Sequence, residues 1–139
     1  MIFADVRRIA GDEAVALAKQ YVKLSADDLT VLQIGADASD PAMAVFMEET
    51  LVALVGFIPI GIITGTVFVW MQEFPDLAKY RIGMMRMGRR MIAEVRKKYP
   101  RIIGQCSGGP RSENWWKSLG AEFEPGDAKT KTFVIGGVL

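Results

Sequence analysis

The chain has 139 residues, half of them hydrophobic, and its 17 Lys and Arg against 16 Asp and Glu give a net charge of +1. That length supports one domain with a proper core, residues 1–139, and that charge gives no general argument for nucleic acid or for an acidic partner. The sequence contains no His and a single Cys, Cys106. Ser-His and Cys-His nucleophile pairs, His-based metal sites, CxxC metal sites and an internal disulfide are therefore excluded, and we expect no metal centre.

The first forty residues predict one strand and two helices. Residues 2–8 alternate loosely between apolar and polar side chains, which predicts a strand. Gly11 and the acid after it offer an N-cap for an amphipathic helix over residues 13–24. Ser25 caps a second, shorter helix. Residues 35–41 are rich in Gly, Asp, Ser and Pro, so we expect a loop there.

Residues 50–72 form a run without any charged side chain, long enough to cross a bilayer as a helix. Glycine and proline interrupt the run at Gly56, Pro59, Gly61 and Gly65, and β-branched residues dominate it. Buried strands separated by turns have this composition. We expect strands at 42–48, 50–57 and 66–72, and we keep a membrane-associated role for this run as a distant alternative.

The second half predicts helix, strand, helix and two final strands. Residues 76–99 give the longest helical pattern, with one face apolar and the rest populated by Arg and Lys, and Pro100 ends it. The later elements are a strand at 102–106, a helix at 111–119 and strands at 121–124 and 130–136.

Three further features have a structural and a functional interpretation. Seven Lys and Arg lie between Arg86 and Arg101. They are compatible with a nucleic-acid or phosphate footprint, but no aromatic platform interleaves them, so we favour a solvated helix face. Trp115 and Trp116 are adjacent on a predicted helix, so one should face the core and the other the surface or a partner. Cys106 ends a predicted buried strand and is expected to act as a small hydrophobe.

The order strand, turn, helix, strand, helix over residues 66–124 resembles the acyl-CoA-binding half of the GNAT family of N-acetyltransferases. Residues 115–123, WWKSLGAEF, are similar to the family signature LYEKLGF. The resemblance implies an α/β (α+β) fold, a single domain with a mixed, mostly antiparallel sheet of about seven strands and helices on both faces.

The resemblance also implies where a cofactor would bind. In the family a proline is followed by a loop of pattern [Q/R]-x-x-G-x-[G/A], whose backbone N–H groups and following helix hold the pyrophosphate of CoA. Pro75 takes the proline position, and Ala78 replaces the Gln or Arg. Arg81 replaces the first glycine and Gly83 matches the last. Arg81 and Gly83 are therefore the implied cofactor-binding residues, with acetyl-CoA as the cofactor if the chain is an enzyme. Arg81 offers a guanidinium to a phosphate but fills the space that glycine leaves open.

The implied catalytic groups are incomplete. The signature tyrosine, which protonates the departing thiolate in many family members, corresponds to Trp116, whose indole cannot act as a general acid. The family's asparagine before this helix corresponds to Gly109. Glu73 lies where some members keep a general-base carboxylate, and it is our candidate catalytic residue, together with Gln72 and backbone donors.

Within this superfamily the chain is most similar to internal virion protein A of short-tailed phages and its relatives. Lys98, Tyr99 and the segment from Ser112 to Ala121 fit that branch, whose pyrophosphate loop is equally degenerate. The first hypothesis is therefore a catalytically degenerate GNAT-fold protein of a phage or prophage, acting as a virion-associated or assembly or ejection protein. It would need no cofactor. The alternative is an acetyl-CoA-dependent N-acetyltransferase with a nonstandard site.

Location and partners follow from the first hypothesis. Asp5, Arg7 and Arg8 interrupt the N-terminus before an apolar segment could form, so we expect no secretory signal. The host cytoplasm, with packaging in the virion, is the expected location. Other virion or phage proteins and further copies of the chain are the expected partners.

Overall fold

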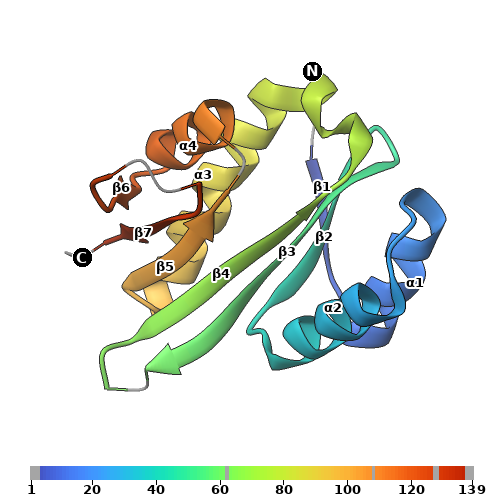
Figure 1. Ribbon diagram of the computed structural model, residues 1–139, viewed down its shortest axis with the longest axis horizontal. Coiled ribbons are helices and arrows are strands. Elements are labelled where there is room, and N and C mark those ends of the chain that lie inside the picture. The colour runs from blue at the N-terminus through green and yellow to red at the C-terminus, as the bar shows by residue number, and fades with distance from the viewer. Residues whose placement is uncertain (1–3, 62, 108, 127–128, 137–139) are drawn as a thin grey trace. The chain divides into compact units, whose positions relative to one another are not determined.

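Seven strands in the described residues form one mixed sheet, in the order β1-β2-β3-β4-β5-β7-β6 (Figure 1). The computed structural model describes residues 4–61, 63–107, 109–126 and 129–136. The strands are β1 (Ala4–Arg8), β2 (Ala42–Met47), β3 (Thr50–Gly61), β4 (Thr66–Glu73), β5 (Arg101–Cys106), β6 (Glu122–Phe123) and β7 (Lys131–Ile135). The helices are α1 (Gly11–Tyr21), α2 (Ala26–Ala38), α3 (Arg81–Lys98) and α4 (Gly109–Ser118), with a 3₁₀ helix, η1 (Pro75–Tyr80).

The pairing of the strands is mostly antiparallel. β1 pairs with β2, β2 with β3, β5 with β7 and β6 with β7 in this way. β4 and β5 are parallel, with Thr66–Val69 opposite Arg101–Gly104. Parallel neighbours need a crossover connection, which η1 and α3 supply here. The expected α+β fold with a mixed, mostly antiparallel sheet of seven strands is confirmed.

The uncharged run forms β3 and β4, so the prediction that it is sheet is confirmed. β3 continues to Gly61, four residues beyond the expected end. Gly56 and Pro59 do not break it, and the chain turns only at residues 63–65, where Gly65 has a φ of +62°. No helix in the described part of the chain has the length and apolar content to cross a membrane.

The chain divides into two compact units. Unit 1 comprises Met1–Ile58 and Met71–Met84, and unit 2 comprises Pro59–Trp70 and Met85–Leu139. The elements β3, β4 and α3 each continue from one unit into the other. The expectation of a single domain over residues 1–139 stays a prediction.

In unit 1 the helices α1 and α2 pack side by side through Gly11 (Figure 1). The Gly11 backbone N–H donates a hydrogen bond of 2.7 Å to Oδ1 of Asp37. A Cβ at Gly11 would lie 2.5 Å from the carbonyl oxygen of Gln33, so only glycine allows this approach. The predicted loop at 35–41 is therefore wrong in its first half. Residues 35–38 continue α2, because Asp37 has to lie on the helix to accept the Gly11 bond.

Unit 2 has its core where α3 and α4 contribute apolar side chains to the strands that follow them. The predicted apolar face of the long helix is confirmed, since Met87, Met91, Ile92 and Val95 are all buried. A Cβ at Gly104 in β5 would lie 2.6 Å from Cζ of Phe133 in β7. The glycine therefore leaves room for the fully buried Phe133 ring.

Candidate functional site

The end of β4 in unit 1 is fixed by Phe74. This side chain is 3% exposed, and its ring meets that of Tyr21 edge-on, with the centroids 5.9 Å apart. Its backbone N–H donates to the carbonyl oxygen of Val52 in β3 at 3.0 Å. The chain leaves the sheet immediately afterwards, because Pro75 has no N–H to continue the ladder and its fixed φ suits the first position of a helix.

The segment that corresponds to the pyrophosphate loop is helical. Pro75–Tyr80 form η1, and Arg81 has φ −56° and ψ −46°, so η1 runs into α3 without an intervening loop. The single α-helix predicted over residues 76–99 is wrong in this first part. In a continuous helix each N–H points at a carbonyl three or four residues earlier. The backbone N–H groups around Arg81 and Gly83 are therefore turned to internal partners, unlike those of the open loop that the family resemblance implies.

Arg81 and Gly83 lie together in the first turn of α3 but play different parts. A Cβ at Gly83 would lie 3.1 Å from Cε of Met47, a fully buried residue of β2. The glycine therefore has a packing role that is independent of any ligand. Arg81 is exposed and pairs with no acid among the described residues, so its guanidinium is available to an anion. The cofactor-binding role of both residues stays a prediction.

A contact between η1 and the β2–β3 turn was not foreseen from the sequence. The Tyr80 hydroxyl donates to Oε2 of Glu48 at 3.2 Å. Partial burial, helped by the bond to Glu48, raises the pKa of Tyr80 above its ordinary value, so the hydroxyl stays protonated near neutral pH. The next residue back, Lys79, pairs with Asp76 at 3.1 Å, and the hydrogen bond to that carboxylate raises the pKa of Lys79.

Glu48 and Glu49 form a two-residue turn with an unfavourable backbone. Their φ angles are +49° and +68°, a region that favours glycine or asparagine, so both residues sit in a strained conformation. The turn opens β3, and the Phe74–Val52 bond puts the end of β4 beside the start of the same strand. Three carboxylates, Glu48, Glu49 and Glu73, therefore belong to one end of the unit 1 strands.

Glu73 is exposed at the end of β4. The side-chain amide of its neighbour Gln72 donates a hydrogen bond of 3.1 Å to the Glu73 carbonyl oxygen. A carboxylate in this position can accept a proton from a cationic substrate. The geometry is compatible with the proposed base, and the catalytic role of Glu73 stays a prediction.

In unit 2 the position of the family's tyrosine is part of the core. Trp116 is 6% exposed and packs on Phe133, with the ring centroids 4.7 Å apart. Trp115 meets Trp116 edge-on at 4.7 Å and is only partly buried. The prediction that one of the two indoles faces the core is confirmed for Trp116. Gly109, the counterpart of the family's asparagine, begins α4 with a φ of +78°.

Cys106 is 5% exposed at the end of β5, as expected of a small hydrophobe. In the described part of the chain no group of three or more His, Cys, Asp or Glu is arranged to hold a metal ion.

No protein-family model matches the chain, and no curated protein matches it. Solved structures do. Spermidine/spermine N-acetyltransferase SpeG from Vibrio cholerae, in complex with manganese ions, is similar with a TM-score of 0.69 and 13% identity, over 96% of this chain and 92% of that one. The dodecameric structure of spermidine N-acetyltransferase from Vibrio cholerae is similar with a TM-score of 0.67 and 14% identity, over 95% of this chain and 92% of that one. A probable acetyltransferase is similar with a TM-score of 0.67 and 11% identity, over 96% of this chain and 92% of that one.

At identities this low the likeness concerns the backbone and not the substrate. Each match nevertheless covers nearly the whole of both chains, which is more than the shared strand and helix order of residues 66–124 would produce alone. The likeness to the phage branch stays a prediction. The chain has the GNAT fold.

Proposed function

We propose that the chain is a GNAT-fold protein of a phage or prophage that has lost acyl transfer and serves as a virion-associated or assembly protein. The continuous run from η1 into α3 carries this proposal, because it removes the backbone cradle that holds the CoA pyrophosphate in the family. The burial of Trp116 supports it, since no proton donor takes the tyrosine's place there. The phage part rests on the sequence likeness of the segment from Ser112 to Ala121.

Binding of acetyl-CoA is the direct test. Losing several charge-assisted hydrogen bonds, at roughly 1.5–3 kcal/mol each, moves a micromolar ligand to about millimolar. Calorimetry with acetyl-CoA, and with CoA as the control for the thioester, should show no binding tighter than about 100 μM. A dissociation constant in the low micromolar range would contradict the proposal.

A second candidate, an N-acetyltransferase with a nonstandard site, is favoured by a different observation. Two of the similar solved structures are N-acetyltransferases named for spermidine, and the third is a probable acetyltransferase. Unit 1 carries six Lys and Arg against eleven Asp and Glu, a net charge of −5, which suits a cationic amine acceptor. Glu73 would accept the proton of that amine, and Arg81 would supply the positive charge that the missing backbone cradle does not.

The second candidate makes its own prediction. If CoA release from acetyl-CoA and spermidine is detected, Glu73→Gln should lower kcat by about 10²–10⁴-fold, because the amide cannot accept the proton. The matched control is Asp76→Asn, which removes an acid three residues later in the chain that pairs with Lys79. The kcat of this variant should stay near that of the wild type. Equal activity in both variants would remove Glu73 from the mechanism.

A further inference from the structure

The net charge of +1 conceals two units of opposite charge. Unit 2 carries eleven Lys and Arg against five Asp and Glu, a net charge of +6, while unit 1 carries −5, and the two together give the +1 of the whole chain. Charge that is concentrated in this way attracts an anionic partner to one unit even when the total is near zero. The net charge of the whole chain therefore does not describe the electrostatics of unit 2 by itself.

The positive charge is ordered along α3. With 3.6 residues per turn, five cations and Ala93 fall within about 120° of the helix circumference and extend over about 16 Å. These cations are Arg86, Arg89, Arg90, Arg96 and Lys97, all of them exposed. The single acid between Arg86 and Lys97 is Glu94, whose Oε1 forms a salt bridge of 2.8 Å with Nζ of Lys97. Arg86, Arg89 and Arg90 make no ion pair or hydrogen bond with any residue that the structure describes.

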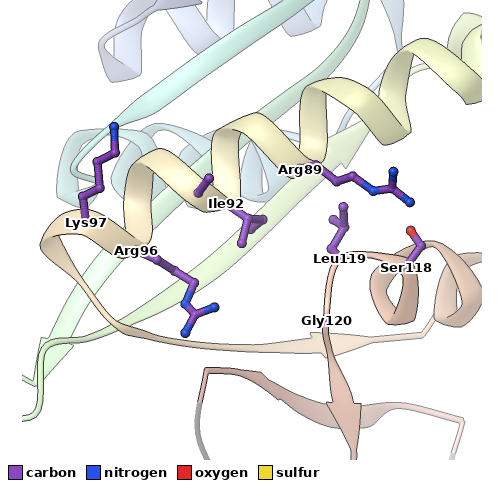
Figure 2. Close-up of a pocket in the computed structure, with 8 residues that line it drawn as sticks. Arg89, Ile92, Arg96, Lys97, Ser118, Leu119 and Gly120 are labelled. Carbon is purple, nitrogen blue, oxygen red and sulfur yellow. The ribbon is translucent and has the colours of Figure 1, made fainter.

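A groove of about 640 Å³ lies beside this face, between α3 and the end of α4. Ile92 and Leu119 form its apolar floor, and Arg89 and Arg96 supply its charge. Figure 2 shows both arginine side chains leaving α3 on the side of Ser118 and Gly120, whereas the side chain of Lys97, which also lines the groove, leaves the helix in another direction.

The Arg96 guanidinium is held in this orientation. Its Nε donates to the carbonyl oxygen of Pro100 at 3.2 Å, which leaves the other N–H groups for a ligand. None of the described residues that line the groove is an acid. Planar guanidinium groups match the oxygens of a phosphate better than an ammonium group does.

We propose that this basic face of α3, with the groove beside it, binds the phosphate backbone of a nucleic acid without reading its sequence. The length of the face exceeds what a single phosphate needs and suits several successive phosphates. A membrane surface is less suitable, because four apolar side chains in the unit 2 part of α3 are buried and are not available to lipid. They are Met87, Met91, Ile92 and Val95. This inference does not depend on either proposed function.

Fluorescence anisotropy with a labelled 30-base-pair duplex tests the proposal. We expect a dissociation constant of about 10⁻⁴–10⁻⁶ M at moderate salt, as for sequence-independent binding. With about three phosphates neutralised, the affinity should fall roughly 40-fold between 50 and 200 mM salt. A second duplex of shuffled sequence should bind within about twofold. A preference above tenfold would overturn sequence-independent binding, and no binding at 50 mM salt would overturn the proposal.

Paired variants separate this face from the general charge of unit 2. The double variant Arg89→Gln/Arg90→Gln should reduce the logarithmic salt slope by about two and weaken binding at least tenfold at 50 mM salt. The matched control is Arg111→Gln/Lys129→Gln, which removes two exposed charges of the same unit outside the groove. It should change binding less than threefold. Equal losses in the two double variants would overturn the assignment to α3.

Two competitors exclude other anions. At fixed ionic strength, 10 mM inorganic phosphate should leave the duplex bound, and complete displacement would show a single-anion site instead. Vesicles containing phosphatidylserine should bind no tighter than vesicles of phosphatidylcholine alone. If vesicles bind in an Arg89-dependent way and the duplex does not, the face is a membrane surface and the proposal fails. All four substituted side chains are exposed, so thermal melts of the variants should match the wild type.

Discussion

Replacing Trp116 by Ala is expected to lower the free energy of unfolding by about 3–5 kcal/mol and the melting temperature by roughly 10 °C. The indole is almost completely buried and stacks on Phe133, which is itself fully buried, so the truncation leaves a cavity in the centre of unit 2. Thermal melts followed by circular dichroism measure the effect. The far-UV spectrum at low temperature should remain that of a mixed α and β protein.

Trp115→Ala is the matched control, because it removes the same side chain one position earlier on α4. Trp115 is only partly buried, and its indole nitrogen lies buried without a hydrogen-bond partner among the described residues. We expect a loss of about 1–2 kcal/mol, mainly from its edge-on contact with Trp116. If Trp115→Ala costs as much as Trp116→Ala, the assignment of Trp116 to the core is wrong.

Gly11→Ala is expected to cost about 2–4 kcal/mol, although it adds only one methyl group. The new Cβ would lie 2.5 Å from a backbone oxygen of α2 and 2.6 Å from the Asp37 carboxylate. The two helices would have to separate, and the bond from Gly11 N–H to Asp37 would be lost with that movement. Urea unfolding gives the free energy, and an unchanged m-value would show that the unfolded state is not altered.

Gly126→Ala provides the comparison for the glycine effect. A Cβ there would meet nothing within 4 Å, so the cost comes only from its φ of +124° and should be about 1–2 kcal/mol. A Gly11→Ala variant as stable as the wild type would mean that α1 and α2 do not approach as closely as described.

The sequence predicts most of the elements because their signals are local. The β-branched run predicted β3 and β4, and Pro100 predicted the end of the long helix. The failures come from contacts between distant residues. Asp37 extends α2 by bonding to a residue 26 positions away, and no local pattern reports that bond. Likewise, Phe74 is anchored on Val52 of β3 and on Tyr21 of α1. No local pattern reports these contacts, after which residues 75–80 form a 3₁₀ helix and not the first part of an α-helix.

The candidate site was predicted in part. Family resemblance pointed to Glu73, Arg81 and Gly83, and the structure places all three around the end of β4 and the start of α3. The bond between Tyr80 and Glu48 joins residues 32 positions apart, so only the fold reveals it. Gly83 is the opposite case. A Cβ at this position would crowd the Met47 side chain, and a motif comparison does not detect that packing requirement.

The separation of charge between the units also affects how the protein behaves in solution. With −5 on one unit and +6 on the other, two copies can attract each other although each is nearly neutral as a whole. Such attraction is strong at low ionic strength and is screened within about 10 Å at 0.1 M salt. We therefore expect dilute buffer to favour association of this protein and moderate salt to reverse it. Salt has the opposite effect on proteins that stay apart through a large net charge of one sign.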